Sequence, residues 1–159
     1  VNLNQTKKVG DIHSSGALQA ANLENIYFSE ASRVYLEEAV PKVKASLSHN
    51  LNWKDATFYL RNTYFGKVTS PDIIDAHGDG IVSLSEHQTI TDKIITDVSV
   101  AYKLTKNLGI TLGANNLFDI YPTKNLTAST NNDQFIYSRS TSQFGLNGRY
   151  VFSRLNFNF

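Results

Sequence analysis

A segment near the middle of the chain, rich in aspartate and glycine, has the residue types and spacing of a calcium-binding loop. Residues 75–86 read Asp-Ala-His-Gly-Asp-Gly-Ile-Val-Ser-Leu-Ser-Glu. A twelve-residue calcium loop takes ligands from its positions 1, 3, 5, 7, 9 and 12 and turns sharply at a glycine in position 6. Gly80 occupies that turn position. The ligand positions hold Asp75, His77, Asp79, Ile81 (through its carbonyl), Ser83 and Glu86.

Two features of this segment depart from the template. His77 offers nitrogen where calcium prefers oxygen. Pro71 stands just upstream and a strand-like pattern follows, so the flanks lack the helix pair of an EF-hand. The sequence therefore leaves two interpretations open, an isolated calcium loop or a solvated loop rich in Asp and Gly.

The other residues with chemical potential form no catalytic constellation. The histidines, His13, His49, His77 and His87, share no metal-ligand spacing. No Ser/His/Asp order, carboxylate pair or phosphate-binding glycine loop is recognisable, so we expect a protein that is not an enzyme. The 15 Lys and Arg nearly balance the 14 Asp and Glu, which gives no support to a nucleic-acid partner. Because the chain has no cysteine, disulfide and thiolate–metal frameworks are excluded.

The elements that would position this loop are β-strands, because apolar and polar residues alternate with period two over several stretches. These stretches are residues 1–9, 42–51, 56–66, 93–104, 108–115 and 143–159. The turns expected at 52–55 and 105–107 are short, whereas the other connections are long. The composition from Ser29 to Val40 predicts a short helix that ends before Pro41. No apolar run reaches the ~20 residues of a transmembrane helix.

Alternation of short turns with long loops is typical of outer-membrane β-barrels, whose periplasmic turns are short and whose extracellular loops are long. It predicts that Trp53 and the 105–107 turn lie at one end of the sheet, opposite the loops centred near His77 and Asn131. One face of the sheet would then meet lipid and the other a polar lumen. The residues expected to point outward include Val98, Val100, Leu108, Ile110 and Leu112. Those expected to point inward include Ser99, Ala101, Thr111 and Gly113.

The last strand carries a change of phase in its alternation. Phe144, Leu146 and Tyr150 stand at even positions, whereas Leu155 and Phe157 stand at odd ones. A period-two pattern changes phase through an extra residue, so we expect a β-bulge between Tyr150 and Leu155. Aromatic residues near strand ends are expected to form the interfacial girdles of a membrane barrel. These are Trp53, Tyr102, Tyr121, Tyr150 and Phe159.

Several motifs, in this order, resemble the C-terminal barrel end of a TonB-dependent outer-membrane receptor of the Bacteroidetes type. The most specific is Gly113-Ala-Asn-Asn-Leu-Phe-Asp-Ile-Tyr-Pro122, which is similar to the penultimate-strand signature of that family. The others are Pro41-Lys-Val-Lys-Ala45, Arg61-Asn-Thr-Tyr-Phe-Gly66, Thr96-Asp-Val-Ser-Val-Ala-Tyr102 with Leu104-Thr-Lys-Asn107, and Gln143-Phe-Gly-Leu-Asn-Gly-Arg-Tyr150.

The resemblance implies an all-β chain, an antiparallel meander of about six strands from the C-terminal end of a large transmembrane β-barrel in the bacterial outer membrane. Residues 1–159 would be a fragment, because the family's N-terminal plug domain and earlier barrel strands are missing. The parent would import a small-molecule substrate, a ferric siderophore, haem, cobalamin or glycan, with energy from the TonB complex. The implied partners are outer-membrane lipid, the missing plug and strands, and TonB through the parent.

Two other interpretations of the sequence stay open. The chain could be a complete small outer-membrane barrel that serves as a structural protein or passive pore. It could also be a soluble calcium-binding β-module built around residues 75–86. The residues that would bind a transported ligand are not identifiable from the sequence.

Overall fold

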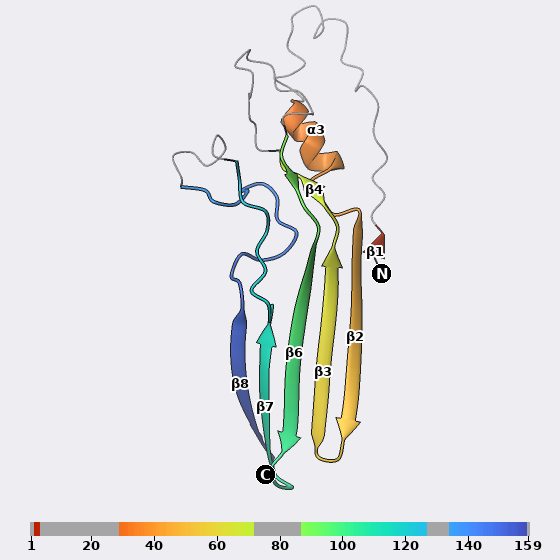
Figure 1. The fold of residues 1–159 in the computed structure, drawn as a ribbon, viewed down its shortest axis with the longest axis vertical. Coiled ribbons are helices and arrows are strands. Elements are labelled where there is room, and N and C mark those ends of the chain that lie inside the picture. Colours follow the sequence, from red (N-terminus) through yellow and green to blue (C-terminus); the bar gives the residue numbers. More distant parts are fainter. Residues whose placement is uncertain (1, 4–28, 72–86, 127–133, 159) are drawn as a thin grey trace, which may run out of the picture.

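The computed structural model describes residues 2–3, 29–71, 87–126 and 134–158. A single antiparallel sheet dominates them, with its strands side by side in the order β1-β2-β3-β6-β7-β8 (Figure 1). The strands are β1 (Asn2–Leu3), β2 (Val43–Trp53), β3 (Ala56–Phe65), β6 (Lys93–Lys103), β7 (Leu108–Asn115) and β8 (Tyr150–Phe157). The predicted all-β antiparallel meander is confirmed.

A small substructure lies where β3 leads into β6. Strand β4 (Val68–Thr69) pairs with β5 (Thr89–Ile90), and the single described helix, α3 (Glu30–Glu37), lies beside them. The Ser29 side chain caps this helix, because its Oγ accepts a hydrogen bond from the Ser32 backbone N–H at 3.3 Å. The helix predicted between Ser29 and Val40 is thus confirmed.

The two ends of the sheet differ, as the alternation of turns and loops predicts. The hairpin between β2 and β3 turns at Lys54 and Asp55, and it lies at the same end as the β6–β7 turn and the chain's C-terminus (Figure 1). We call this the turn end. Helix α3 and strand β4 lie at the opposite end, which we call the loop end. His77 and Asn131, the predicted centres of two loops, fall outside the described residues.

The beginning of the last strand differs from the prediction. Strand β8 starts at Tyr150, not at residue 143, and pairs with β7 without interruption from Asn115↔Tyr150 to Leu108↔Phe157. The expected β-bulge between Tyr150 and Leu155 is therefore wrong. No change of phase is needed, because residues 143–149 lie outside the sheet and Tyr150 simply faces the side opposite to Leu155.

The most deeply buried part of the apolar core lies at the loop end, and Ala56, Phe65, Ile95 and Ala114 of the long strands are also buried. Its most enclosed residues are Val34 of α3, Val68 of β4 and Ile90 of β5, each at most 2% exposed. Along the strands, in contrast, many large apolar side chains remain open to the surroundings. The described part of the chain therefore buries few apolar residues, and within it many large apolar side chains of the sheet have no covering protein.

Candidate functional site

One face of the sheet is almost entirely apolar, and we call it the apolar face. Register defines it, since residues directly opposite on neighbouring strands share a face. Its apolar members on the five long strands include Leu47, Leu51, Trp53, Phe58, Leu60, Val98, Val100, Tyr102, Leu108, Ile110, Leu112, Leu155 and Phe157. Leu47, Leu112 and Leu155 are 60%, 54% and 69% exposed. Soluble monomers rarely expose an apolar surface this extensive.

A few polar residues interrupt the apolar face. Asn62 and Thr96 lie opposite each other near the loop end, and the Thr96 hydroxyl donates to Asn62 Oδ1 at 2.7 Å. This pair satisfies part of its own hydrogen-bonding need, which lowers the cost of placing it in apolar surroundings. His49 lies opposite Leu60 between two leucines of its own strand.

The opposite side of the sheet, the polar face, carries hydroxyls, amides and charges. Its members include Lys44, Ser46, Ser48, Asn50, Arg61, Thr63, Asp97, Ser99, Thr111 and Arg154. The residues predicted to point outward and those predicted to point inward thus lie on opposite faces, as expected. Apolar and polar sides that alternate along every strand are the pattern of a membrane barrel wall with a polar interior.

An ion pair ties the polar face to the segment after β7. Asp97 Oδ2 accepts from Arg61 Nε at 2.9 Å and from Nη2 at 2.7 Å, across the β3–β6 pair. Asp97 Oδ1 accepts from the Asn116 backbone N–H at 2.9 Å. Asp97 is only 7% exposed, and these three donors compensate for its removal from water. Asp97 therefore joins β3, β6 and the turn after β7.

That turn is the part of the chain with the most specific sequence motif. Asn116 and Asp119 both have positive φ, of 50° and 58°, which Asn and Asp tolerate better than most residues. The Asn116 side chain closes the turn: its Nδ2 donates to the Ile120 carbonyl at 2.7 Å, and its Oδ1 accepts from the Ile120 N–H at 2.9 Å. The motif therefore has a structural role in shaping the turn after β7.

Residues 143–149 fold back over the polar face and are held at both ends. The Gln143 side chain donates through Nε2 to the Gly66 and Thr91 carbonyls. At the other end, Asp119 Oδ1 accepts from the Arg149 N–H at 2.7 Å. The negative charge of Asp119, more than desolvation, also raises the pKa of the neighbouring Tyr121 phenol.

The aromatic residues expected at the strand ends divide between the two faces. Trp53 and Tyr102 lie on the apolar face at the turn end, 63% and 47% exposed, and both fit an interfacial girdle. Tyr150 begins β8 but lies on the polar face, where its ring is 6.2 Å from that of Phe152. The prediction that Tyr150 belongs to the girdle is therefore wrong. Tyr121 follows β7 outside the strands, and Phe159 falls outside the described residues.

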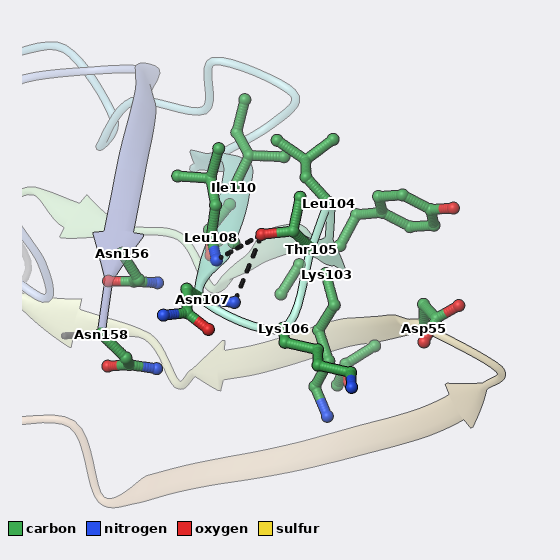
Figure 2. A pocket seen from close by; sticks show the side chains of 15 residues that line it. Asp55, Lys103, Leu104, Thr105, Lys106, Asn107, Leu108, Ile110, Asn156 and Asn158 are labelled. Carbon is green, nitrogen blue, oxygen red and sulfur yellow. Dashed lines mark hydrogen bonds between the residues drawn. The ribbon is translucent and has the colours of Figure 1, made fainter.

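A hollow of about 730 Å³ opens at the turn end, between the β6–β7 turn and the end of β8 (Figure 2). Thr105 shapes the turn, since its Oγ1 accepts from the Asn107 and Leu108 N–H groups. The Asn107 carbonyl accepts from the Asn158 N–H at 2.9 Å. These contacts hold the strand ends together, and the hollow gathers no catalytic set of side chains.

The predicted metal ligands cannot be placed. Asp75, His77, Asp79, Ile81, Ser83 and Glu86 lie outside the described residues. Within the described ranges no group of three or more His, Asp or Glu side chains could hold a metal. His87 is described; it is 6% exposed, and its ring nitrogens have no hydrogen-bond partner among the residues that the structure describes. In the same ranges, no helix has the length and apolar character needed to cross a membrane.

Comparison with family models and with curated proteins finds no match. Solved structures do match. One is a mutant of the ferric enterobactin receptor PfeA of Pseudomonas aeruginosa, with a TM-score of 0.51 and 19% identity. Another is a second mutant of that receptor in complex with enterobactin, with a TM-score of 0.52 and 20% identity. The chain has the fold of part of a receptor β-barrel.

This chain spans only a small part of the matched receptors. The matches cover 76% of this chain but only 16% and 17% of the two receptor chains. At this identity the likeness shows the fold alone. The matched proteins are receptors and not enzymes, which agrees with the expectation from the sequence.

Two features that organise the polar face were not predicted from the sequence. The first is the Arg61–Asp97 ion pair. The opposite charges of these two residues indicate that they could pair, but the strand register that places them opposite each other was not predicted. The second is the return of residues 143–149 over the polar face, for which the sequence carries a weaker signal. It lies in Gly145 and Gly148, which interrupt a stretch otherwise resembling a strand.

Proposed function

We propose that this chain is the C-terminal part of the barrel of a bacterial outer-membrane receptor that imports a small solute. The observation that carries the proposal is the apolar face, which the described residues leave uncovered along all five long strands. Lipid is the partner that fits a broad, flat apolar surface backed by a polar side. The resemblance of the motifs and the barrel fold of the matched receptors support the same assignment.

The edges of the sheet support membership in a larger barrel. Among the described residues, strand β8 pairs with β7 on one side only, and β1 pairs only with β2. In hydrocarbon each unpaired backbone N–H or C=O group costs several kcal/mol, so an open sheet does not persist there. Further strands from the parent chain would pair with these edges and close the barrel.

The transported solute and its energy source are the finer part of the proposal. The resemblance allows TonB-coupled import of a ferric siderophore, and the matched receptors, which are described as ferric enterobactin receptors, favour that class. Haem, cobalamin and glycans are the other classes that the resemblance allows. A plug domain in the full-length protein would gate the lumen and connect the receptor to TonB.

Uptake by cells that carry or lack the full-length gene tests this function. We expect the protein in the outer-membrane fraction, and we expect deletion to abolish uptake of one radiolabelled solute from a panel of ferric siderophores, haem, cobalamin and glycans. An uncoupler that removes the inner-membrane potential should stop that uptake. Uptake that persists with the uncoupler would support the passive pore instead.

A second test separates a membrane wall from a soluble calcium module. Residues 1–159 expressed alone should aggregate or require detergent, because one face is apolar and the sheet edges are open. A monodisperse monomer in detergent-free buffer would contradict the barrel assignment and favour the soluble module.

A further inference from the structure

A cavity of about 340 Å³ lies on the polar face toward the loop end. Strands β2, β3 and β6 supply one wall, and residues 144–148 supply another. The Phe144 ring packs against Phe65 with centroids 5.3 Å apart, which holds the covering segment against the sheet. The cavity is thus built by elements that the hydrogen bonds of Gln143 and Arg149 fix in place.

The charges that line this cavity are unbalanced. Two cations, Lys44 and Arg61, face one carboxylate, Asp97, which leaves a net charge of +1. Asp97 already accepts hydrogen bonds on both oxygens, from Arg61 and from the Asn116 N–H. Lys44 has no ion-pair partner in the described part of the chain; its Nζ lies 4.7 Å from the centre of the Phe65 ring.

Two hydroxyl groups lie between the cations along the sheet. Ser46 is opposite Thr63, one step from the Lys44↔Phe65 pair and one step from the Ser48↔Arg61 pair on the same face. The Ser46 and Thr63 hydroxyl oxygens are 3.0 Å apart, so one donates to the other. The accepting hydroxyl keeps its own proton available for a further acceptor.

We infer that this cavity binds a carboxylate group between Lys44 and Arg61. A carboxylate accepts several hydrogen bonds at once, and ammonium, guanidinium and hydroxyl donors suit it. Arg61 can bind two carboxylates. Asp97 occupies only the Nε and Nη2 edge of the Arg61 guanidinium, and the Arg61 side chain is 45% exposed. The bound group would neutralise the excess charge of the cavity. The inferred carboxylate site goes beyond the proposed transport function, and the inference depends only on residues at the polar face.

The carboxylate could come from a free solute or from an Asp or Glu side chain elsewhere in the full-length protein. Saturation-transfer NMR of the full-length protein in detergent, with acetate as the probe, tests the free-solute source. If the site is open, acetate binds saturably, and Lys44→Gln weakens binding roughly tenfold or more. Thr63→Val, which removes a hydroxyl at similar volume, should also weaken it. Lys103→Gln, on the same face outside the cavity, should leave binding unchanged.

Thermal melting of the same variants tests the internal source. If a side chain of the protein already fills the site, acetate does not bind, and Lys44→Gln lowers the melting temperature clearly more than Lys103→Gln. In that case Thr63→Val also lowers it. The inference is overturned if acetate fails to bind and Lys44→Gln and Lys103→Gln melt alike. It is equally overturned if acetate binds to all variants with the same affinity.

Discussion

Asp97 accepts a 2.9 Å hydrogen bond from the backbone N–H of Asn116, so that a carboxylate on β6 fixes the start of the turn after β7. The other carboxylate oxygen holds Arg61 of β3. A single buried group therefore connects three successive parts of the sheet. This arrangement gives the most specific motif of the chain a structural role, because the backbone N–H of Asn116 at the start of the turn finds its acceptor in Asp97.

Replacing Asp97 by Asn should destabilise the barrel. The amide can still accept from the Asn116 N–H, but it loses the charge that pairs with Arg61, and we expect a loss of about 1–3 kcal/mol in unfolding free energy. Urea unfolding of the full-length protein in lipid vesicles measures it. Asp55→Asn, in the exposed β2–β3 turn, is the control and should change little. Equal stability of the two variants would show that the Asp97 connection does not stabilise the fold.

At Gly148 both the backbone conformation and the surrounding atoms leave no room for a side chain. Its φ is +64°, and an added Cβ would collide with the Tyr121 hydroxyl and approach Asp119 Oδ1 to 2.7 Å. Gly148→Ala should cost at least about 1–2 kcal/mol, from the left-handed backbone alone. Gly145→Ala is the matched control, because a Cβ there meets nothing within 4 Å. The same urea titration compares them, and indistinguishable midpoints would contradict the described path of residues 143–149.

Arginine substitutions at adjacent residues of β7 probe the two faces. Ile110→Arg places a charge on the apolar face and should cost about 2–4 kcal/mol if that position lies near the bilayer midplane. Thr111→Arg places the same charge on the polar face and should cost much less. Folding yield into lipid vesicles measures the difference. Equal yields would mean that the apolar face does not meet hydrocarbon.

The loop at residues 75–86 remains a prediction from the sequence. If it binds calcium, Asp75, Asp79 and Glu86 supply carboxylate oxygens at about 2.3–2.6 Å. Isothermal titration calorimetry of the full-length protein should then show heat on calcium addition that Glu86→Ala abolishes. Glu37→Ala, in α3, should keep it. Absence of heat at millimolar calcium would favour the solvated loop.

The regular part of the fold could be predicted because strand alternation is a local signal. Leu108, Ile110 and Leu112 reveal their face by spacing alone, and the lengths of the connections separate the turn end from the loop end. The assignment failed at residues 143–149, where apolar residues at even positions suggested a strand. Tertiary hydrogen bonds from Gln143 and the positive φ of Gly148 take this segment out of the sheet.

The contacts on the polar face could not be predicted from the sequence, for a different reason. Pairing Arg61 with Asp97 requires the register of β3 against β6, and a long loop separates these strands, so no short turn sets it. The cavity near Lys44 additionally requires the returning segment with Phe144. Each depends on chain segments far apart in sequence, whereas the face of a strand depends on its own residues.

Spin-label accessibility at neighbouring positions tests the central claim most directly. The 159-residue chain has no cysteine, so Leu112→Cys and Thr111→Cys would each add one labelling site to it. The measurement uses full-length protein in lipid vesicles and compares collisions of each nitroxide with oxygen, which concentrates in lipid, and with a water-soluble nickel chelate. We predict more oxygen collisions at position 112 and relatively more nickel collisions at position 111. High nickel and low oxygen accessibility at position 112 would contradict a lipid-facing apolar surface, and with it the barrel-wall function.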